Sequence, residues 1–165
     1  MKTKILAIAC LFLLWTSCSR ENEKELTLFN GFKFATDSTE QLADRDSLAQ
    51  IPYTKYFNNM EQVQVPLYRV IEGKEYRIYL GIPFHTTLGK LAAFRKEKPM
   101  ADTVLQLSES NTAFYRCFIK DSLYLTEYIQ PLDSTSMICV YAVSKDAQVA
   151  ATRLSEAQLK ARIIK

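Results

Sequence analysis

The sequence has few of the residues on which common catalytic and nucleotide-binding motifs depend. Its 165 residues include four glycines and one histidine, His85. It contains no GxGxxG, GxxxxGKS/T or GxSxG pattern, which excludes the usual phosphate-cradling loops and the nucleophile elbow. A single histidine excludes a His-based metal cluster within one chain, and neither HExxH nor a zinc-type Cys/His spacing occurs. We therefore expect neither a metal nor a cofactor.

The chain also lacks a concentrated charge of one sign. Lysine and arginine number 21 against 18 for aspartate and glutamate. Lys2 and Lys4 lie in the amino-terminal segment, so 19 basic residues face 18 acidic ones in the rest of the chain. Proteins that bind nucleic acid generally carry a basic face that displaces phosphate counterions. The near-neutral balance excludes nucleic acid as an expected partner.

The first 18 residues are typical of an export signal. Lys2 and Lys4 precede an apolar run from Ile5 to Trp15, which small polar residues follow. Eleven residues at ~1.5 Å each cover roughly half of the ~30 Å hydrocarbon core of a bilayer. The segment is therefore too short for a permanent membrane span, and we expect it to be removed.

The end of this segment, Trp15-Thr16-Ser17-Cys18, resembles the lipobox of bacterial lipoproteins. Trp15 departs from the aliphatic residue usual at that position. The resemblance implies that residues 1–17 are a signal peptide and that Cys18 becomes the lipidated first residue, carrying acyl chains such as palmitate. Several acyl chains, at about 0.8 kcal/mol for each buried CH₂, anchor a protein stably in a membrane.

The residues after Cys18 predict a polar tether over 18–25. Ser19, with no Asp at that place, resembles lipoprotein cargo sorted to the outer membrane. Glu21, Glu23 and Glu25 are similar to the acidic stretches of surface-exposed lipoproteins, although a solvated linker explains them as well. The sequence predicts a lipid-anchored protein of the cell envelope and leaves its membrane face open.

The remaining residues, 26–165, predict one domain. The chain is 48% hydrophobic and 12% aromatic, which is enough to form a core, and no repeat or low-complexity tract divides it. We expect an α+β fold, mainly an antiparallel sheet of about five to seven strands with two or three short helices. The predicted strands are residues 26–34 with a bend or hairpin at Asn30-Gly31, then 63–71, 75–82, 103–107, 113–119, 123–129 and 137–143. The predicted helices begin near Ser38, at Thr86 or Thr87, and at Ser155.

Cys117 and Cys139 are the thiols that remain after the export segment and Cys18. An oxidising compartment favours a disulfide between them. If the three strands around them form a simple meander, however, the two cysteines lie two strands apart, about 9.6 Å, beyond the ~7 Å limit for a bridge. A disulfide and two buried free thiols both stay open.

Three loop aromatic residues, Tyr53, Tyr56 and Phe57, are candidates for binding a glycan or a partner protein, although packing in the core explains such residues more often. If the protein is an enzyme, His85 and the acidic pair Asp44 and Asp46 are the candidate catalytic residues. A lone histidine is more often a plain hydrogen-bonding residue, and a solvated helix surface explains the acidic pair.

These patterns favour a non-enzymatic, lipid-anchored envelope module that binds a partner protein or a glycan. Two alternatives remain. One is a small envelope enzyme that uses carboxylates or His85. The other is a structural subunit of an outer-membrane complex.

Overall fold

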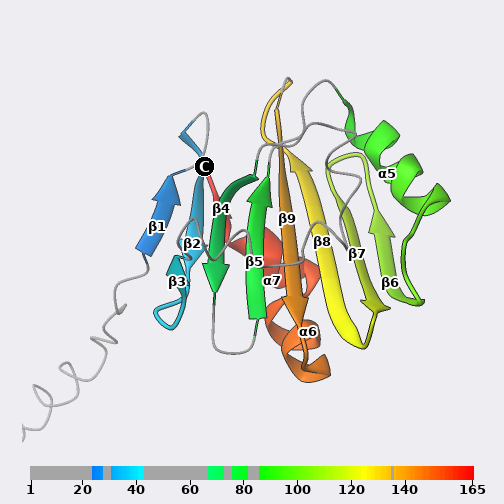
Figure 1. The fold of residues 1–165 in the computed structure, drawn as a ribbon. Coiled ribbons are helices and arrows are strands. Elements are labelled where there is room, and N and C mark those ends of the chain that lie inside the picture. The colour runs from blue at the N-terminus through cyan, green and yellow to red at the C-terminus, as the bar shows by residue number, and fades with distance from the viewer. Residues whose placement is uncertain (1–23, 28–30, 43–66, 73–75, 82–85, 135) are drawn as a thin grey trace, which may run out of the picture.

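Two antiparallel sheets and three helices make up the part of the chain that the computed structural model describes, residues 24–27, 31–42, 67–72, 76–81, 86–134 and 136–165 (Figure 1). The large sheet has seven strands in the order β3-β4-β5-β9-β8-β7-β6. The small sheet has three strands in the order β1-β2-β10. The expected α+β class with a mainly antiparallel sheet is confirmed.

In chain order, the strands and helices are as follows. The strands are β1 (Lys24–Thr27), β2 (Lys33–Thr36), β3 (Gln41–Leu42), β4 (Leu67–Glu72), β5 (Tyr76–Gly81), β6 (Thr103–Glu109), β7 (Phe114–Lys120), β8 (Leu123–Pro131), β9 (Met137–Ser144) and β10 (Ile163–Ile164). The helices are α5 (Leu88–Glu97), α6 (Ala147–Arg153) and α7 (Glu156–Ala161).

Strand β9 lies at the centre of the large sheet, between β5 and β8. Side chains alternate along a strand, so its residues divide between the two faces. Ile138, Val140 and Ala142 belong to one buried cluster, whereas Cys139 and Tyr141 belong to the other. A strand that is apolar on both faces must be covered on both sides.

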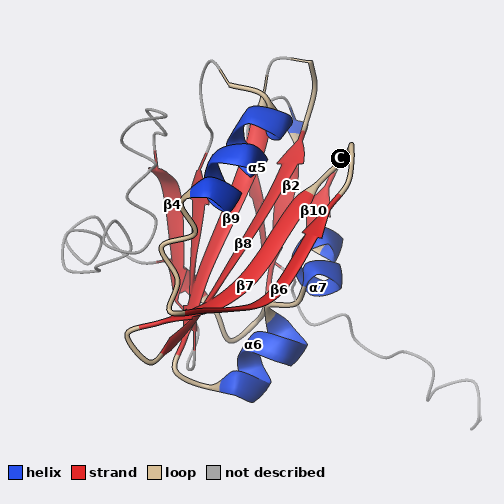
Figure 2. Cartoon of the chain, turned by 90° about the vertical axis from the view of Figure 1, so that its right-hand side faces the viewer, coloured by secondary structure: helices blue, strands red, loops and turns tan. Residues whose placement is uncertain are grey.

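The two faces are covered by different elements. Helix α5 packs through Leu91 and Ala92 on the face that contains Tyr141. Helices α6 and α7 pack through Val149 and Leu159 on the opposite face, where the small sheet also contributes to the core. Figure 2 shows α5 on one side of the large sheet and α7 on the other. The helices therefore cover both faces of the large sheet.

Local capping interactions explain where the helices begin. The Thr87 hydroxyl accepts a hydrogen bond from the Lys90 amide at 3.4 Å, as expected for the start of α5. Helix α6 was not predicted, although Asp146 caps it by accepting the amides of Gln148 and Val149 at 2.8 and 2.9 Å. Helix α7 follows Ser155 as predicted, but the Ser155 side chain makes no capping bond.

The beginning of the domain confirms one prediction and corrects another. Strands β1 and β2 pair as an antiparallel hairpin, and Gly31 between them has a φ of 78°, which glycine adopts without a steric penalty. A helix was expected after Ser38, yet Gln41–Leu42 form strand β3, paired with β4. In place of the start of a helix, residues 37–40 form a turn in which Asp37 accepts the Thr39 amide and Glu40 accepts the Asp37 amide. The remainder of that predicted helix, from residue 43, lies outside the described residues.

Candidate functional site

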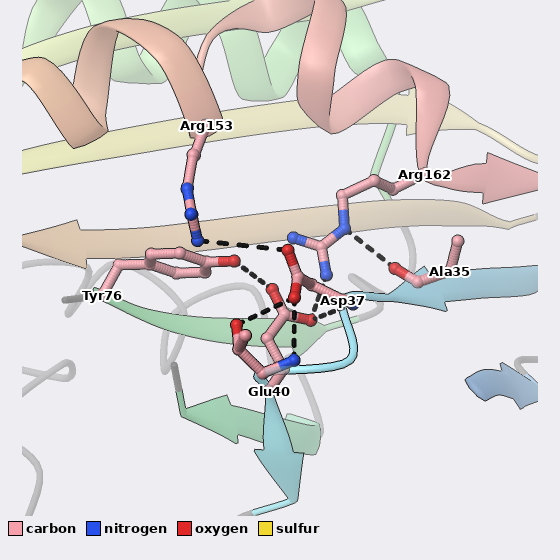
Figure 3. A network of polar contacts seen from close by, with 7 residues as sticks. Ala35, Asp37, Glu40, Tyr76, Arg153 and Arg162 are labelled. Atoms are coloured by element: carbon pink, nitrogen blue, oxygen red, sulfur yellow. Dashed lines mark hydrogen bonds and ion pairs between the residues drawn. The ribbon is translucent and has the colours of Figure 1, made fainter. Parts of the chain in front are cut away.

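A pocket of about 290 Å³ lies between the small sheet, strand β5 and helices α6 and α7. Figure 3 shows the polar network that surrounds it. The pocket is lined by Ala35, Thr36, Asp37, Tyr76, Arg153, Gln158 and Arg162. Its walls therefore combine residues from both ends of the domain.

The acidic side of the pocket is set by a turn after β2. Asp37 Oδ1 accepts hydrogen bonds from the Thr39 amide and the Thr39 hydroxyl, both at 2.8 Å. These bonds, with a smaller contribution from the nearby guanidinium groups of Arg153 and Arg162, hold the pKa of Asp37 below its ordinary value. Asp37 is thus an ionised carboxylate in a fixed orientation.

Beneath the pocket, Glu40 joins three segments that are far apart in the sequence. Its buried carboxylate accepts hydrogen bonds from the Tyr76 hydroxyl, from Arg162 Nη2 and, at 3.0 Å, from the Asp37 amide. Burial, together with the hydrogen bond to Glu40, raises the pKa of Tyr76 to about 12. With three donors, this carboxylate connects the β2–β3 connection to β5 and to the residue before β10.

The two arginines of the pocket differ in how firmly they are held. Arg162 Nε donates to the Ala35 carbonyl at 2.8 Å, and its guanidinium lies 4.6 Å from the ring centroid of Phe34. Arg153 is half exposed, and its Nη1 approaches Asp37 Oδ2 at 4.0 Å, which is too long for a hydrogen bond. The pocket therefore presents one fixed and one adaptable cation beside a fixed anion.

A second polar cluster crosses the large sheet beneath α5. In the strand register Arg116 lies opposite Glu127, Glu127 opposite Tyr141, and Tyr141 opposite Tyr79. These four residues form one buried row on the face that α5 covers. A row of this kind places polar groups directly under the helix.

Helix α5 adds Arg95 to that row. Arg95 Nε donates to Glu127 Oε1 at 2.7 Å, Arg116 Nε donates to Glu127 Oε2 at 2.6 Å, and Arg116 Nη1 donates to the Pro99 carbonyl at 2.7 Å. Arg95 Nη1 and Nη2 are buried and have no hydrogen-bond partner among the described residues. Two guanidinium groups therefore share one carboxylate, and the trio retains a net charge of +1.

Burial alone would disfavour the ionised form of Glu127, but the adjacent guanidinium groups outweigh it and lower its pKa. The Glu127 carboxylate on β8 binds α5 through Arg95 and the neighbouring strand β7 through Arg116. Each oxygen is occupied by a donor, which favours a structural role for this cluster over a catalytic one.

The third feature is the edge strand β6. It pairs with β7 on one side and is the last strand of the large sheet in the described part of the chain. Val104, Leu105 and Leu107 are 46%, 51% and 49% exposed. A register shift between Val104 and Gln106 marks a β-bulge at Leu105. A seven-residue edge with three large exposed aliphatic side chains is an unusual surface for an isolated domain.

Most of the site residues predicted from the sequence lie outside the part of the chain that the structure describes. Cys18, Tyr53, Tyr56, Phe57, His85, Asp44 and Asp46 lie outside the described residues. Their roles stay predictions. The residues that the structure brings together instead are Asp37, Glu40 and Arg162 in one cluster and Arg95 and Glu127 in the other.

Of the two alternatives left open for Cys117 and Cys139, the structure has the buried free thiols. Both cysteines are free and buried. They lie on β7 and β9, which β8 separates, and they belong to the clusters on opposite faces of the sheet. Burial raises the pKa of Cys139 to about 12, and burial also raises the pKa of Cys117. Both thiols are therefore core residues of low reactivity.

The described residues also bear on metal binding and on membrane-spanning helices. No group of three or more His, Cys, Asp or Glu side chains there is placed to hold a metal ion. None of the helices in those ranges has both the length and the apolar character needed to cross a membrane. Comparison with protein-family models, curated proteins and solved structures finds no match to this chain.

Proposed function

We propose that this chain is a lipid-anchored protein of the bacterial outer membrane whose domain is a non-enzymatic module that binds a partner protein. The lipid anchor rests on the amino-terminal pattern that ends at Cys18. The binding role rests on the exposed edge strand β6.

Strand β6 suits recognition by strand addition. An edge strand offers a row of backbone donors and acceptors, and an extended segment of another protein pairs with them. Side chains from alternate positions then provide specificity. Val104, Leu105 and Leu107 supply aliphatic surface beside that edge, and aliphatic side chains suit a protein partner better than a glycan, which stacks on aromatic faces.

The opposite edge of the large sheet gives a contrast. In the described part of the chain, strand β3 has two residues and so offers a partner less backbone than β6, which has seven. Short edge strands are one of the ways in which proteins avoid unwanted pairing. The long apolar edge at β6 is the observation that carries the proposal.

The binding role is tested by site-specific photo-crosslinking in living cells. A photoreactive residue replaces Leu105 in one variant and Leu42, which lies on β3 and is 50% exposed, in the matched control. We expect a discrete protein adduct from position 105 that the control does not give. The adduct should disappear when Leu107→Lys is added. Equal labelling from both positions, or no adduct from position 105, would contradict the proposal.

The lipid anchor needs a separate test. Cells that make the wild type or Cys18→Ser are grown with labelled palmitate, and the protein is isolated. We expect label on the wild type and none on the variant, which should also keep the uncleaved signal segment. A variant that still takes up label, or a wild type that never does, refutes the anchor.

A further inference from the structure

The pocket in Figure 3 is separate from the β6 edge and is built from different elements. Its volume, about 290 Å³, lies near the lower end of small-molecule sites. Two guanidinium groups and one carboxylate line it, whereas the carboxylate of Glu40 lies buried beneath them and is occupied by three donors. The lining therefore offers charges of both signs to a small occupant.

The guanidinium groups on the cationic side of this pocket can donate more hydrogen bonds than they form within the protein. Arg162 is fixed through Nε and Nη2 by the Ala35 carbonyl and Glu40. Arg153 is 49% exposed, and its guanidinium approaches the Asp37 carboxylate at 4.0 Å. Figure 3 shows both guanidinium groups reaching from the helical layer toward the Asp37 carboxylate. A ligand carboxylate placed there would gain charge-assisted hydrogen bonds.

On the anionic side of the pocket, the Asp37 carboxylate is also held in position for a ligand. Thr39 donates to Asp37 Oδ1, whereas Oδ2 faces Arg153 across 4.0 Å. Because the turn fixes the carboxylate before any ligand arrives, little ordering is needed on binding. A ligand ammonium at Oδ2 would form the hydrogen bond that Arg153 is too distant to form.

We infer that this pocket binds a compact zwitterion of the α-amino acid type, with the ligand carboxylate between Arg153 and Arg162 and its ammonium on Asp37. The opposite charges of the site lie 4.0 Å apart, so the ligand must carry its own two charges on adjacent groups. A simple anion would meet the repulsion of Asp37, and a simple cation would meet that of the two arginines. The remaining volume, bordered by Ala35 and Tyr76, accommodates a small apolar side chain.

The probes for this inference differ by one group at a time. Valine carries both charges on one carbon. The probe 3-methylbutanoate lacks the ammonium, isobutylamine lacks the carboxylate, and 5-aminopentanoate is an isomer of valine with its charges at opposite ends. Each is titrated into the domain while amide NMR signals of residues around the pocket, such as Thr36, Tyr76 and Arg162, are followed.

We expect valine to shift those signals saturably and each of the other three probes to bind about tenfold more weakly or less. Arg153→Gln and Asp37→Asn should each weaken valine binding by about tenfold, whereas the exposed Lys160→Gln, outside the pocket lining, should not. Because Arg153 is half exposed, its replacement should leave the fold intact. Absence of valine shifts, binding of 3-methylbutanoate or 5-aminopentanoate as tight as that of valine, or an unchanged affinity in Arg153→Gln would overturn the inference.

Discussion

Glu127 is the residue whose replacement tests the buried cluster beneath α5 most directly. In Glu127→Gln the side chain keeps its shape but loses the charge that balances Arg95 and Arg116. The fully buried trio then changes from a net charge of +1 to two unbalanced cations. A glutamine side chain has one acceptor oxygen where the carboxylate has two. One guanidinium Nε–H therefore faces the glutamine NH₂ group, which is also a donor.

Breaking a buried ion pair by removing one partner costs about 3–5 kcal/mol, because the remaining charge stays buried without compensation. Unfolding free energies of single domains are about 5–15 kcal/mol, so this loss is a large part of the total. At about 2–4 °C for each kcal/mol in a domain of this size, the midpoint of thermal unfolding should fall by about 6–20 °C. Circular dichroism during heating and urea titration of the domain would measure both quantities.

The matched control is Arg95→Met. It removes the guanidinium whose two terminal nitrogens lack partners among the described residues and leaves Glu127 paired one-to-one with Arg116. We expect it to cost clearly less than Glu127→Gln, since apolar replacement of buried charges is often tolerated. A loss below about 1 kcal/mol in Glu127→Gln, or a larger loss in Arg95→Met, would refute the reasoning.

The same carboxylate predicts a pH dependence. Because the pKa of Glu127 is lower in the folded state than in the unfolded chain, its contribution is fully present above the ordinary glutamate range. That contribution declines as the pH falls through the lowered pKa. The wild type should therefore lose more stability on acidification than Glu127→Gln does. Parallel acid-induced losses in the two proteins would show that this residue is not ionised in the fold.

Four further outcomes follow from residues described above. Unfolding the protein without reductant should expose both Cys117 and Cys139 to alkylation, as mass spectrometry would show, and a bridged pair would contradict the separation by β8. Tyr76→Phe should cost about 1–3 kcal/mol in urea unfolding, because Glu40 loses a donor; a neutral effect would exclude that bond. With its pKa raised to about 12, Tyr76 should also stabilise the fold below pH ~10 and lose that contribution as the pH rises through ~12, which alkaline unfolding of wild type and Tyr76→Phe would compare. Gly31→Ala should cost about 1–2 kcal/mol through backbone strain alone, since nothing lies within 4 Å of an added Cβ, and an unchanged unfolding midpoint would rule out the positive φ.

Hydrophobic patterning predicted the large sheet well. Residues 137–143 are apolar on both faces, and they form the buried central strand β9. Residues 113–119 and 123–129 were predicted as strands, and β7 and β8 pair there across a turn in which Asp121 and Ser122 have positive φ. The start of α5 was predictable because a threonine cap acts locally.

The candidate site was harder to predict, because its contacts join distant parts of the chain. Glu40 and Arg162 are 122 positions apart, and nothing in either local sequence indicates the pairing. For the buried trio a signal was present: Glu127 and Arg116 are charged residues in the interior of strands that are mainly apolar and aromatic. A charge in such a place needs a buried partner. Helix α6 was missed although Asp146 is a suitable cap, because its seven residues give too short a periodic pattern.

The central position of β9 constrains the order in which the strands of the large sheet can pair during folding. Strands β3, β4 and β5 and strands β6, β7 and β8 belong to one sheet only because β9, at residues 137–144, lies between them. A chain that emerges amino end first must hold two incomplete half-sheets with open edges until β9 arrives, and β10 at residues 163–164 closes the small sheet later still. Such delayed, non-local pairing slows folding and leaves adhesive strand edges exposed meanwhile.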